Sequence, residues 1–270
     1  MSKVIAIANQ KGGVGKTEIA IHLAAALSRT DPDANVCLVD LDPQGHATEG
    51  VGLKELYDHQ EVSLFDGLTK MGVDVASLVH DVPFERFFLV PGHYNMMLVE
   101  SALNDSRMRR REYRLSDLLT ETGDAFDYVV IDCPPNLGLL TDNAIIAARR
   151  LVVPVQAEQT SVRALELLLD QIQSLEQELK FSVEILTLVP NLVQDSLLAR
   201  RILSTMRQNL PITDFSFPKR VVLQEAYEAG RTIYTYEPDR SKRNDALELQ
   251  ALYTKLAEFI KERIAQNGRR

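Results

Sequence analysis

A glycine-rich segment near the start of the chain has the residue types needed to bind phosphate. The sequence KGGVGKT occupies residues 11–17 and follows the apolar run 4–8 almost directly. Glycines let the backbone bend so that successive N–H groups point at phosphate oxygens, and a following helix N-terminus adds partial positive charge. We therefore expect Lys16 to reach the β- and γ-phosphates of a nucleotide, and the Thr17 hydroxyl to bind Mg²⁺.

The spacing of this loop departs from the common phosphate-loop pattern in two ways. Gln10 stands where the usual pattern begins with glycine, and a second lysine, Lys11, follows it. The alternative is a glycine-rich turn with surface lysines, but the strand–loop–helix context favours a nucleotide site. The residues expected to surround the nucleotide are Gly12, Gly13, Val14, Gly15, Lys16, Thr17 and Glu18.

Carboxylates follow two further apolar runs. Asp40 and Asp42 come at the end of Val36–Val39, and Asp132 comes at the end of Tyr128–Ile131. The carboxyl ends of parallel strands face the ligand crevice of a doubly wound sheet. Asp132 is therefore expected to hold Mg²⁺ through water, beside Thr17. The alternative for Asp40 and Asp42 is that they only cap a loop.

The elements that must position these residues alternate between strands and helices, which predicts an α/β fold with a doubly wound, mostly parallel sheet. The expected strands are 4–8, 36–39, 87–90, 128–131, 151–155 and 183–189. The expected helices are 17–29, 141–149, 162–179, 197–208 and 245–266. The segment 53–114 is less regular and is expected to be a partly helical insertion. No linker is visible, so we expect a single domain over residues 1–270.

Composition limits the class of protein. The chain has 45% hydrophobic and 25% charged residues, a formal net charge of −8 and two cysteines, Cys37 and Cys133, within or beside apolar runs. These values predict a globular cytoplasmic protein with buried thiols rather than a disulfide framework. No stretch approaches the ~20 apolar residues that span a bilayer. The negative charge does not exclude nucleic acid, because a local basic patch can bind it.

The phosphate loop resembles the deviant Walker A motif of the ParA/MinD superfamily of P-loop NTPases. Residues 40–44, DLDPQ, are similar to that family's second switch motif, and residues 132–143, DCPPNLGLLTDN, are similar to its Walker B segment. The resemblance implies that Lys11 contacts phosphate in a partner subunit, so that ATP closes a homodimer. It also implies that Asp42 orients the attacking water and that Asp40 supports the magnesium shell.

The remaining motifs are most similar to short ParA proteins of the Soj-like kind, without a helix-turn-helix extension ahead of the P-loop. Pro190 and Asn191 resemble the segment that seats adenine. Residues 217–226, FPKRVVLQEA, resemble a further family motif, in which Pro218 is also expected to bind the nucleotide. The amphipathic tail 247–264 mixes acidic and basic residues on its polar face, so membrane binding as in MinD is not favoured. Glu18 replaces the threonine usual in relatives and places a carboxylate near the phosphates.

The resemblance implies an ATPase for plasmid or chromosome partition, associated with the nucleoid and reset by a ParB-type partner that stimulates ATP hydrolysis. ATP and Mg²⁺ would drive dimerisation and non-specific binding to double-stranded DNA. The candidate DNA-binding residues are Arg200, Arg201, Arg207, Lys219, Arg220, Arg240, Lys242 and Arg243. Two alternatives stay open: a positioning ATPase that acts on a protein cargo or a membrane, and a metabolic P-loop enzyme.

Overall fold

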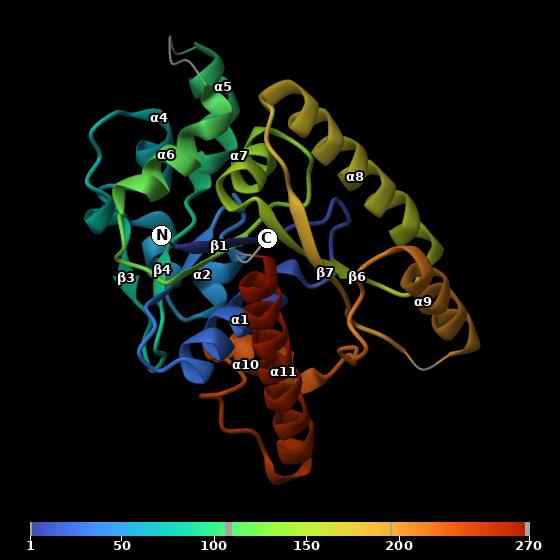
Figure 1. Cartoon of the computed structure of the whole chain (residues 1–270). Coiled ribbons are helices and arrows are strands. Elements are labelled where there is room, and N and C mark those ends of the chain that lie inside the picture. The colour runs from blue at the N-terminus through green and yellow to red at the C-terminus, as the bar shows by residue number, and fades with distance from the viewer. Residues whose placement is uncertain (1, 106–109, 195, 268–270) are drawn as a thin grey trace.

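The chain is built on one twisted seven-stranded sheet in the order β3-β4-β2-β5-β1-β6-β7. Figure 1 shows the computed structural model, which describes residues 2–105, 110–194 and 196–267. Among these residues, all strand pairs are parallel except β3 with β4. The strands are β1 (Lys3–Ile7), β2 (Val36–Asp40), β3 (His80–Asp81), β4 (Phe88–Val90), β5 (Tyr128–Asp132), β6 (Arg150–Val155) and β7 (Glu184–Pro190).

Helices connect the strands along most of the chain. The first half contains α1 (Lys16–Thr30), α2 (His46–Gly50), α3 (Lys54–Asp58), α4 (Leu64–Thr69), α5 (Val99–Asp105) and α6 (Arg114–Glu121). The second half contains α7 (Leu139–Ala148), α8 (Gln159–Leu179), α9 (Leu197–Asn209), α10 (Val221–Glu228) and α11 (Arg243–Asn267). Short 3₁₀ turns lie at η1 (Val75–Leu78), η2 (Tyr94–Leu98), η3 (Arg111–Tyr113) and η4 (Arg240–Lys242).

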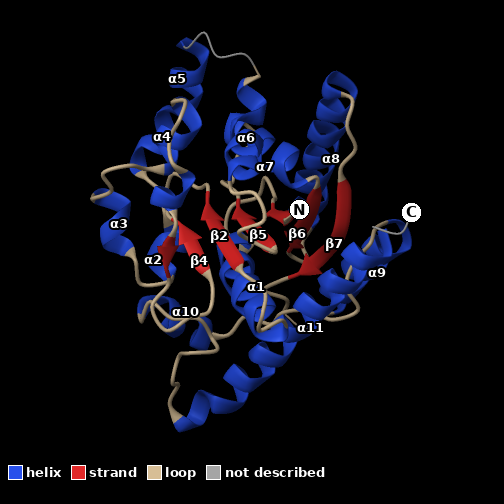
Figure 2. Ribbon diagram, turned by 60° about the vertical axis from the view of Figure 1, so that its left-hand side comes forward, coloured by secondary structure: helices blue, strands red, loops and turns tan. Residues whose placement is uncertain are grey.

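The sheet separates two hydrophobic clusters, because successive side chains of a strand point to opposite faces. Ile5 and Ile7 of β1 belong to the cluster that packs with α1 and α11. Ala6 belongs to the other cluster, which packs with α7 and α8. Figure 2 shows the strands between these two groups of helices. Both faces of the sheet are therefore covered by helices and shielded from water. This explains why the strand sequences are continuous apolar runs.

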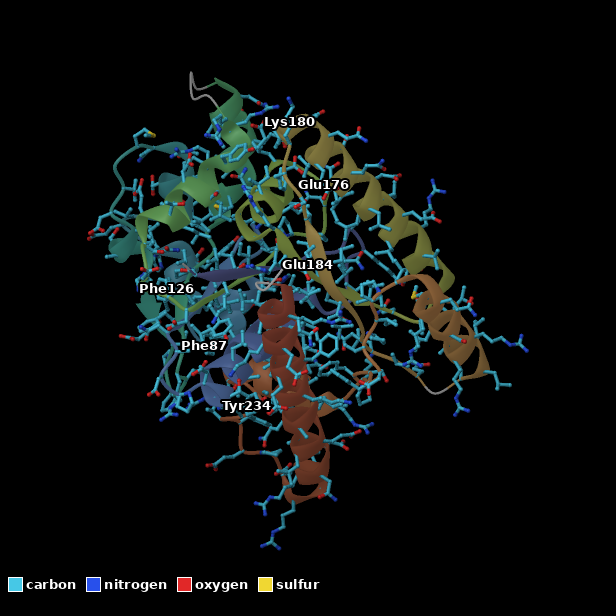
Figure 3. The ribbon with its side chains drawn as sticks, in the orientation of Figure 1. Phe87, Phe126, Glu176, Lys180, Glu184 and Tyr234 are labelled. Carbon is cyan, nitrogen blue, oxygen red and sulfur yellow. The ribbon has the colours of Figure 1, made fainter. Side chains whose placement is uncertain are left out.

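The last helix, α11, packs along α1 and closes one face of the sheet. Tyr253 of α11 is fully buried and stacks on His22 of α1, with ring centroids 4.7 Å apart. Tyr234, labelled in Figure 3, donates from its hydroxyl to the Gln250 carbonyl at 3.1 Å. The apolar face of the amphipathic segment 247–264 is thus part of the hydrophobic core. None of the described helices is long and apolar enough to cross a membrane.

The structure confirms the predicted fold class and its main elements. Each predicted strand and helix is present, with ends that differ by three residues or fewer. The irregular segment 53–114 contains α3, α4, α5 and the short edge strand β3. That strand and the helices α2, α6 and α10 were not predicted, because each is too short for a clear hydrophobic period.

Candidate nucleotide site

The glycine-rich loop joins β1 to α1 at the carboxyl edge of the sheet. β1 ends at Ile7 and α1 begins at Lys16, so residues 8–15 form the loop. Gly13 and Gly15 have φ angles of +71° and +85°, which L side chains rarely adopt. A Cβ at Gly15 would also overlap the amide of Asn191. The loop therefore needs glycine at residue 15 for two independent reasons.

Lys16 lies at the start of α1 and folds back over the loop. Its side-chain nitrogen donates to the carbonyl of Lys11 at 3.4 Å, and only 7% of the residue is exposed. Burial lowers the pKa of Lys16, while the carboxylates of Asp132 and Asp42 act in the opposite direction. An ammonium group held close to the loop and short of solvent is well placed to bind a polyphosphate.

Asp132 ends β5, which lies between β1 and β2 in the sheet. It pairs in register with Ile7 of β1 on one side and with Asp40 of β2 on the other. Asp132 is fully buried, and neither of its carboxylate oxygens has a hydrogen-bond partner among the described residues. Burial, and after it the negative charge of Asp40, raises the pKa of Asp132 well above its ordinary value. The nearby Thr17 side chain and the positive charge of Lys16 act in the opposite direction. Two orphaned oxygens beside Thr17 fit the hard, oxygen-seeking Mg²⁺ ion.

Asp40 is also fully buried, but its carboxylate is held by neighbours. It accepts hydrogen bonds from the Thr48 hydroxyl at 2.6 Å and from the Thr48 backbone at 2.8 Å. Burial raises the pKa of Asp40 to about 6, although the Thr48 hydrogen bonds act in the opposite direction. Thr48 in turn accepts from the backbone of Gly92 at 2.8 Å. Asp40 is thus anchored in place, with little capacity left for a direct ligand.

Asp42 lies two residues beyond β2, in the loop that leads to α2. One of its carboxylate oxygens accepts from the backbone of Gln44 at 3.0 Å, and 6% of the residue is exposed. The strand order brings Asp42, Asp132 and Lys16 to one edge of the sheet, as the sequence predicted. A carboxylate that keeps free acceptor capacity at this edge can orient a water molecule.

Lys11 does not point at its own loop. Its side-chain nitrogen donates to Glu158 at 2.6 Å, to Gln156 at 2.8 Å and to Thr160 at 3.2 Å. These three partners lie between the end of β6 and the first turn of α8. Lys16 and Lys11 therefore occupy different environments, which is consistent with different roles.

A hollow of about 520 Å³ extends from the loop toward α10. Its lining includes Gly13, Gly15, Thr17 and Glu18 at one end, and Leu192, Lys219, Arg220, Val221 and Tyr227 at the other. The segments that contain Pro190 and Pro218 meet beside it, since the Phe217 backbone donates to the Pro190 carbonyl at 2.8 Å. The dimensions suit a nucleotide whose phosphates lie in the loop and whose base lies near α10.

The carboxylate of Glu18 points toward Tyr253 of α11 and toward Asn191. Its carboxylate accepts from the Tyr253 hydroxyl at 3.2 Å and lies 3.5 Å from the Asn191 amide nitrogen. Burial raises the pKa of Glu18 to about 6, and these two hydrogen bonds act against the shift. Asn191 also donates to the Val14 carbonyl at 3.0 Å, so Glu18 and Asn191 belong to one polar network beneath the loop.

Several residues of the site were not predicted from the sequence, because they belong to none of its nucleotide-binding motifs. Thr48 anchors Asp40, Tyr227 lines the hollow and donates to Glu49 at 3.1 Å, and Glu158 holds Lys11. Each is distant in sequence from its motif or belongs to a short helix. Only the assembled fold brings these residues to the site.

The eight basic residues predicted to bind DNA lie on different elements. Arg200, Arg201 and Arg207 are on α9, Arg240 and Lys242 on η4, and Arg243 begins α11. Figure 1 shows α9 and the start of α11 well apart. Lys219 and Arg220 directly precede α10 and also line the nucleotide hollow. Arg220 is paired with Asp245 at 3.3 Å and with Glu248 at 2.8 Å, and Lys242 is paired with Glu225.

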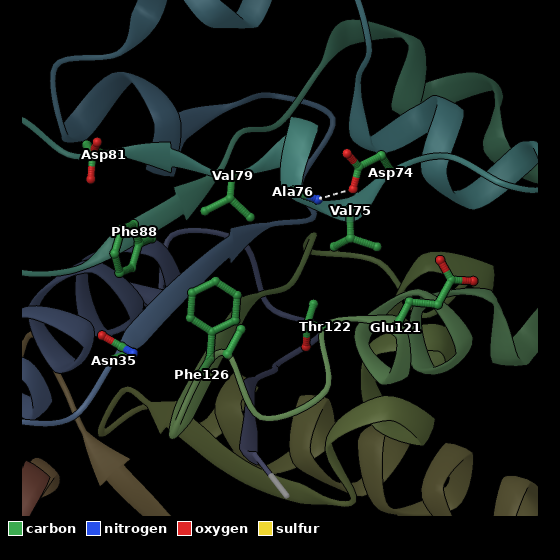
Figure 4. A pocket seen from close by; sticks show the side chains of 11 residues that line it. Asn35, Asp74, Val75, Ala76, Val79, Asp81, Phe88, Glu121, Thr122 and Phe126 are labelled. Atoms are coloured by element: carbon green, nitrogen blue, oxygen red, sulfur yellow. Dashed lines mark hydrogen bonds between the residues drawn. The ribbon is translucent and has the colours of Figure 1, made fainter.

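Another hollow, of about 550 Å³, lies at the amino ends of β2 and β5, away from the phosphate loop. Figure 4 shows Val75, Val79, Phe88 and Phe126 around its apolar part. Asp74, Asp81 and Glu121 stand at its margin. Its lining, as far as the structure describes the chain, contains no lysine or arginine, which are the side chains expected to bind phosphate at the nucleotide site.

A phosphate loop after the central parallel strand β1, with buried aspartates ending β5 and β2, the next two strands of the sheet, defines a P-loop NTPase. Comparison with known proteins places the chain more narrowly. Residues 2–185 match a family model described as "AAA domain". The chain is 34% identical over 265 residues to the chromosome-partitioning ATPase Soj of Thermus thermophilus, covering 97% of this chain and 96% of that protein. It is 33% identical over 241 residues to the sporulation initiation inhibitor protein Soj of Bacillus subtilis, covering 88% and 92%.

Solved structures agree with this placement. The Cyanothece McdA–ATP complex has a TM-score of 0.80 at 26% identity and covers 98% of this chain and 96% of that one. Cobyrinic acid a,c-diamide synthase from Mycobacterium smegmatis, bound to an ATP analogue and magnesium, has a TM-score of 0.74 at 31% identity and covers 85% and 92%. The chain belongs to the ParA/MinD superfamily of ATPases and is similar to its Soj-like members.

Proposed function

We propose that this protein is a ParA-type ATPase that binds ATP and Mg²⁺, dimerises, binds DNA without sequence preference and is reset by hydrolysis. The observation that carries the proposal is the buried, unpartnered carboxylate of Asp132 beside the phosphate loop. A carboxylate is costly to bury without a partner, and a bound divalent cation would offset that cost. Similarity to partition ATPases over nearly the whole chain supports the rest.

In this proposal the residues of the loop divide the work. The backbone of residues 12–17 and the side chain of Lys16 bind the phosphates, while Thr17 and Asp132 hold Mg²⁺, with Asp40 in support. The metal would neutralise charge on the phosphate oxygens.

The remaining residues act on hydrolysis, on the base and on DNA. Asp42 places the attacking water, and Lys11 contacts phosphate in the partner subunit. Pro190, Asn191 and Pro218 seat the base. The eight basic residues then contact DNA phosphates across the dimer.

The proposal extends to a biological role in partition of a plasmid or chromosome. A ParB-type protein would stimulate hydrolysis, and the ATP-bound dimer would associate with the nucleoid. The whole chain, residues 1–270, would act as one ATPase domain. Similarity to chromosome-partitioning ATPases over 97% of this chain or more supports this role over that of a metabolic enzyme.

Sedimentation velocity with no nucleotide, with ADP and with a slowly hydrolysed ATP analogue tests the switch directly. We expect a monomer in the first two conditions and a dimer with the analogue and Mg²⁺. With ATP in place of the analogue, steady-state phosphate release should accompany dimer formation. A chain that stays monomeric at saturating analogue would contradict the proposal, as would nucleotide-dependent transfer of phosphate to a small-molecule acceptor.

A further inference from the structure

The hollow of about 550 Å³ at the amino ends of β2 and β5 combines an apolar interior with an acidic rim. Figure 4 shows Phe88, Val79 and Phe126 facing the same space, and the two phenyl rings lie with centroids 5.7 Å apart. Three exposed carboxylates surround this interior, those of Asp74, Asp81 and Glu121. The carboxylates of Asp81 and Glu121 have no ion-pair partner among the described residues. The rim is therefore free to attract a cation.

The hollow opens beside the edge strand of the sheet. β3 pairs with β4 on one side, and its other side has no strand partner in the part of the chain that the structure describes. Asp81 of β3 also lines a second hollow, of about 730 Å³, whose lining includes α3. Glu55 and Asp58 belong to that lining, and its one lysine, Lys54, is paired with Glu49 at 2.7 Å. The two hollows thus meet at an open strand edge and share an acidic character.

We propose that this edge of the sheet is a docking site for an extended segment of a partner protein, in which basic residues flank a large apolar residue. An added strand can take backbone hydrogen bonds from the open side of β3. Its alternate side chains point to opposite sides, so the apolar residue can enter the first hollow and meet Phe88 and Phe126. The flanking basic residues then reach Asp81 and Glu121. Two hollows joined along a strand edge suit a peptide better than a small molecule, which occupies a single pocket.

The site lies away from the nucleotide. The amino ends of β2 and β5 are at the opposite edge of the sheet from Asp40 and Asp132, which end the same two strands beside the phosphate loop. We therefore expect the same affinity for peptide with and without ATP. The proposal does not depend on the proposed ATPase cycle, so its failure and the failure of that cycle are separate results.

Selection of short random peptides on the immobilised full chain, followed by fluorescence anisotropy of those recovered, tests the site. We expect recovered peptides in which basic residues flank a large apolar one, with binding that weakens from about 0.05 to 0.5 M salt. Asp81→Asn combined with Glu121→Gln should raise the peptide dissociation constant about two- to thirty-fold, as expected for the loss of two exposed ion pairs. Ala125→Trp should abolish binding, because Ala125 is an exposed residue of the lining and the larger side chain would fill the hollow.

A matched control is needed because the chain has a net charge of −8 and attracts basic peptides in general. Glu166→Gln removes one charge from an exposed position of α8 that lines neither hollow, and it should leave peptide binding unchanged. A loss per charge in Glu166→Gln equal to that in the double variant would assign binding to net charge and overturn the proposal. Undiminished binding to Ala125→Trp with wild-type circular dichroism would also overturn it. So would a selection that recovers no peptide of the expected kind.

Discussion

Asp40 and Asp132 are register partners at the carboxyl ends of adjacent parallel strands, and both are fully buried. They differ in what holds them. Asp40 is bound by the hydroxyl and backbone of Thr48, whereas the oxygens of Asp132 have no partner among the described residues. The pair therefore consists of one carboxylate held by hydrogen bonds and one without a hydrogen-bond partner among the described residues, next to the glycine-rich loop.

Asp132→Asn should stabilise the nucleotide-free protein. The substitution removes a buried charge that lacks compensation, so we expect a gain of at least about 1 kcal/mol at pH 7, measured by urea denaturation. Because the folded state raises the pKa of Asp132, the protein is relatively more stable where the group is protonated. The gain should therefore fade at acidic pH. A loss of stability at neutral pH would show that Asp132 is compensated in the free protein.

The same variant should lose the dependence of nucleotide binding on magnesium. Wild-type affinity for ATP should fall when the metal is chelated, and that of Asp132→Asn should change little. Asp142→Asn is a suitable control, since Asp142 lies on α7 and accepts from Gln171. Equal magnesium dependence in wild type and Asp132→Asn would place the metal elsewhere.

Asp42→Ala should separate ATP binding from ATP hydrolysis. The side chain accepts a hydrogen bond from the backbone of Gln44 in the loop after β2, so the variant should fold and bind ATP normally. Turnover should fall roughly 10²- to 10⁴-fold, as expected when a group that positions or activates water is removed. Single-turnover phosphate release measures the effect. Turnover within a few-fold of wild type would contradict the assigned role.

His22 should make stability depend on pH. It is buried against Tyr253, and burial lowers the pKa of His22 to about 4, which keeps the ring neutral. The unfolded chain takes up that proton near pH 6.5, so the folded state loses stability as pH falls from about 6.5 to 4. The loss due to His22 should be about 2–4 kcal/mol.

Glu18 and Asp40 act in the opposite direction, since their pKa values are raised to about 6 and their contribution is lost as pH rises. The comparison of wild type with His22→Gln, by urea denaturation at several pH values, isolates the histidine. A constant difference between the two proteins across this range would contradict the assignment.

Gly13→Ala and Gly15→Ala should differ in severity although both residues have positive φ. A methyl at Gly13 meets no atom of the described residues within 4 Å, so only backbone strain of about 1–2 kcal/mol applies. A methyl at Gly15 would also displace the Asn191 amide from its bonds beneath the loop, and we expect a loss of about 3 kcal/mol or more. Thermal denaturation of the two variants checks the order. Equal losses would show that the Asn191 side chain moves aside freely.

The sequence predicted the central parts of this structure well, because they depend on local patterns. The strands that end in Asp40 and Asp132, and the loop before Lys16, each combine a hydrophobic run with a motif of fixed spacing. The strand order places β5, which ends in Asp132, between β2 and β1. This order follows from the pattern of helical connections only in general terms.

Contacts between distant segments could not be predicted in this way. The hydrogen bond from Lys11 to Glu158 spans 147 residues, and the one from Tyr253 to Glu18 spans 235. Glu158 and Tyr253 lie in a loop and a helix whose local sequences show no relation to the phosphate loop. Their roles follow from packing of β6 and α11 beside β1 and α1, which is a property of the complete fold.

In the proposed function, ATP switches this protein into a DNA-binding dimer. Binding to random-sequence duplex DNA, measured over a salt series with ATP, with ADP and without nucleotide, tests it most directly. We predict tight binding only with ATP, which weakens steeply with salt because phosphate contacts release counterions. Absence of DNA binding in every state, despite ATP binding, would contradict the claim and favour a positioning ATPase with a protein or membrane cargo.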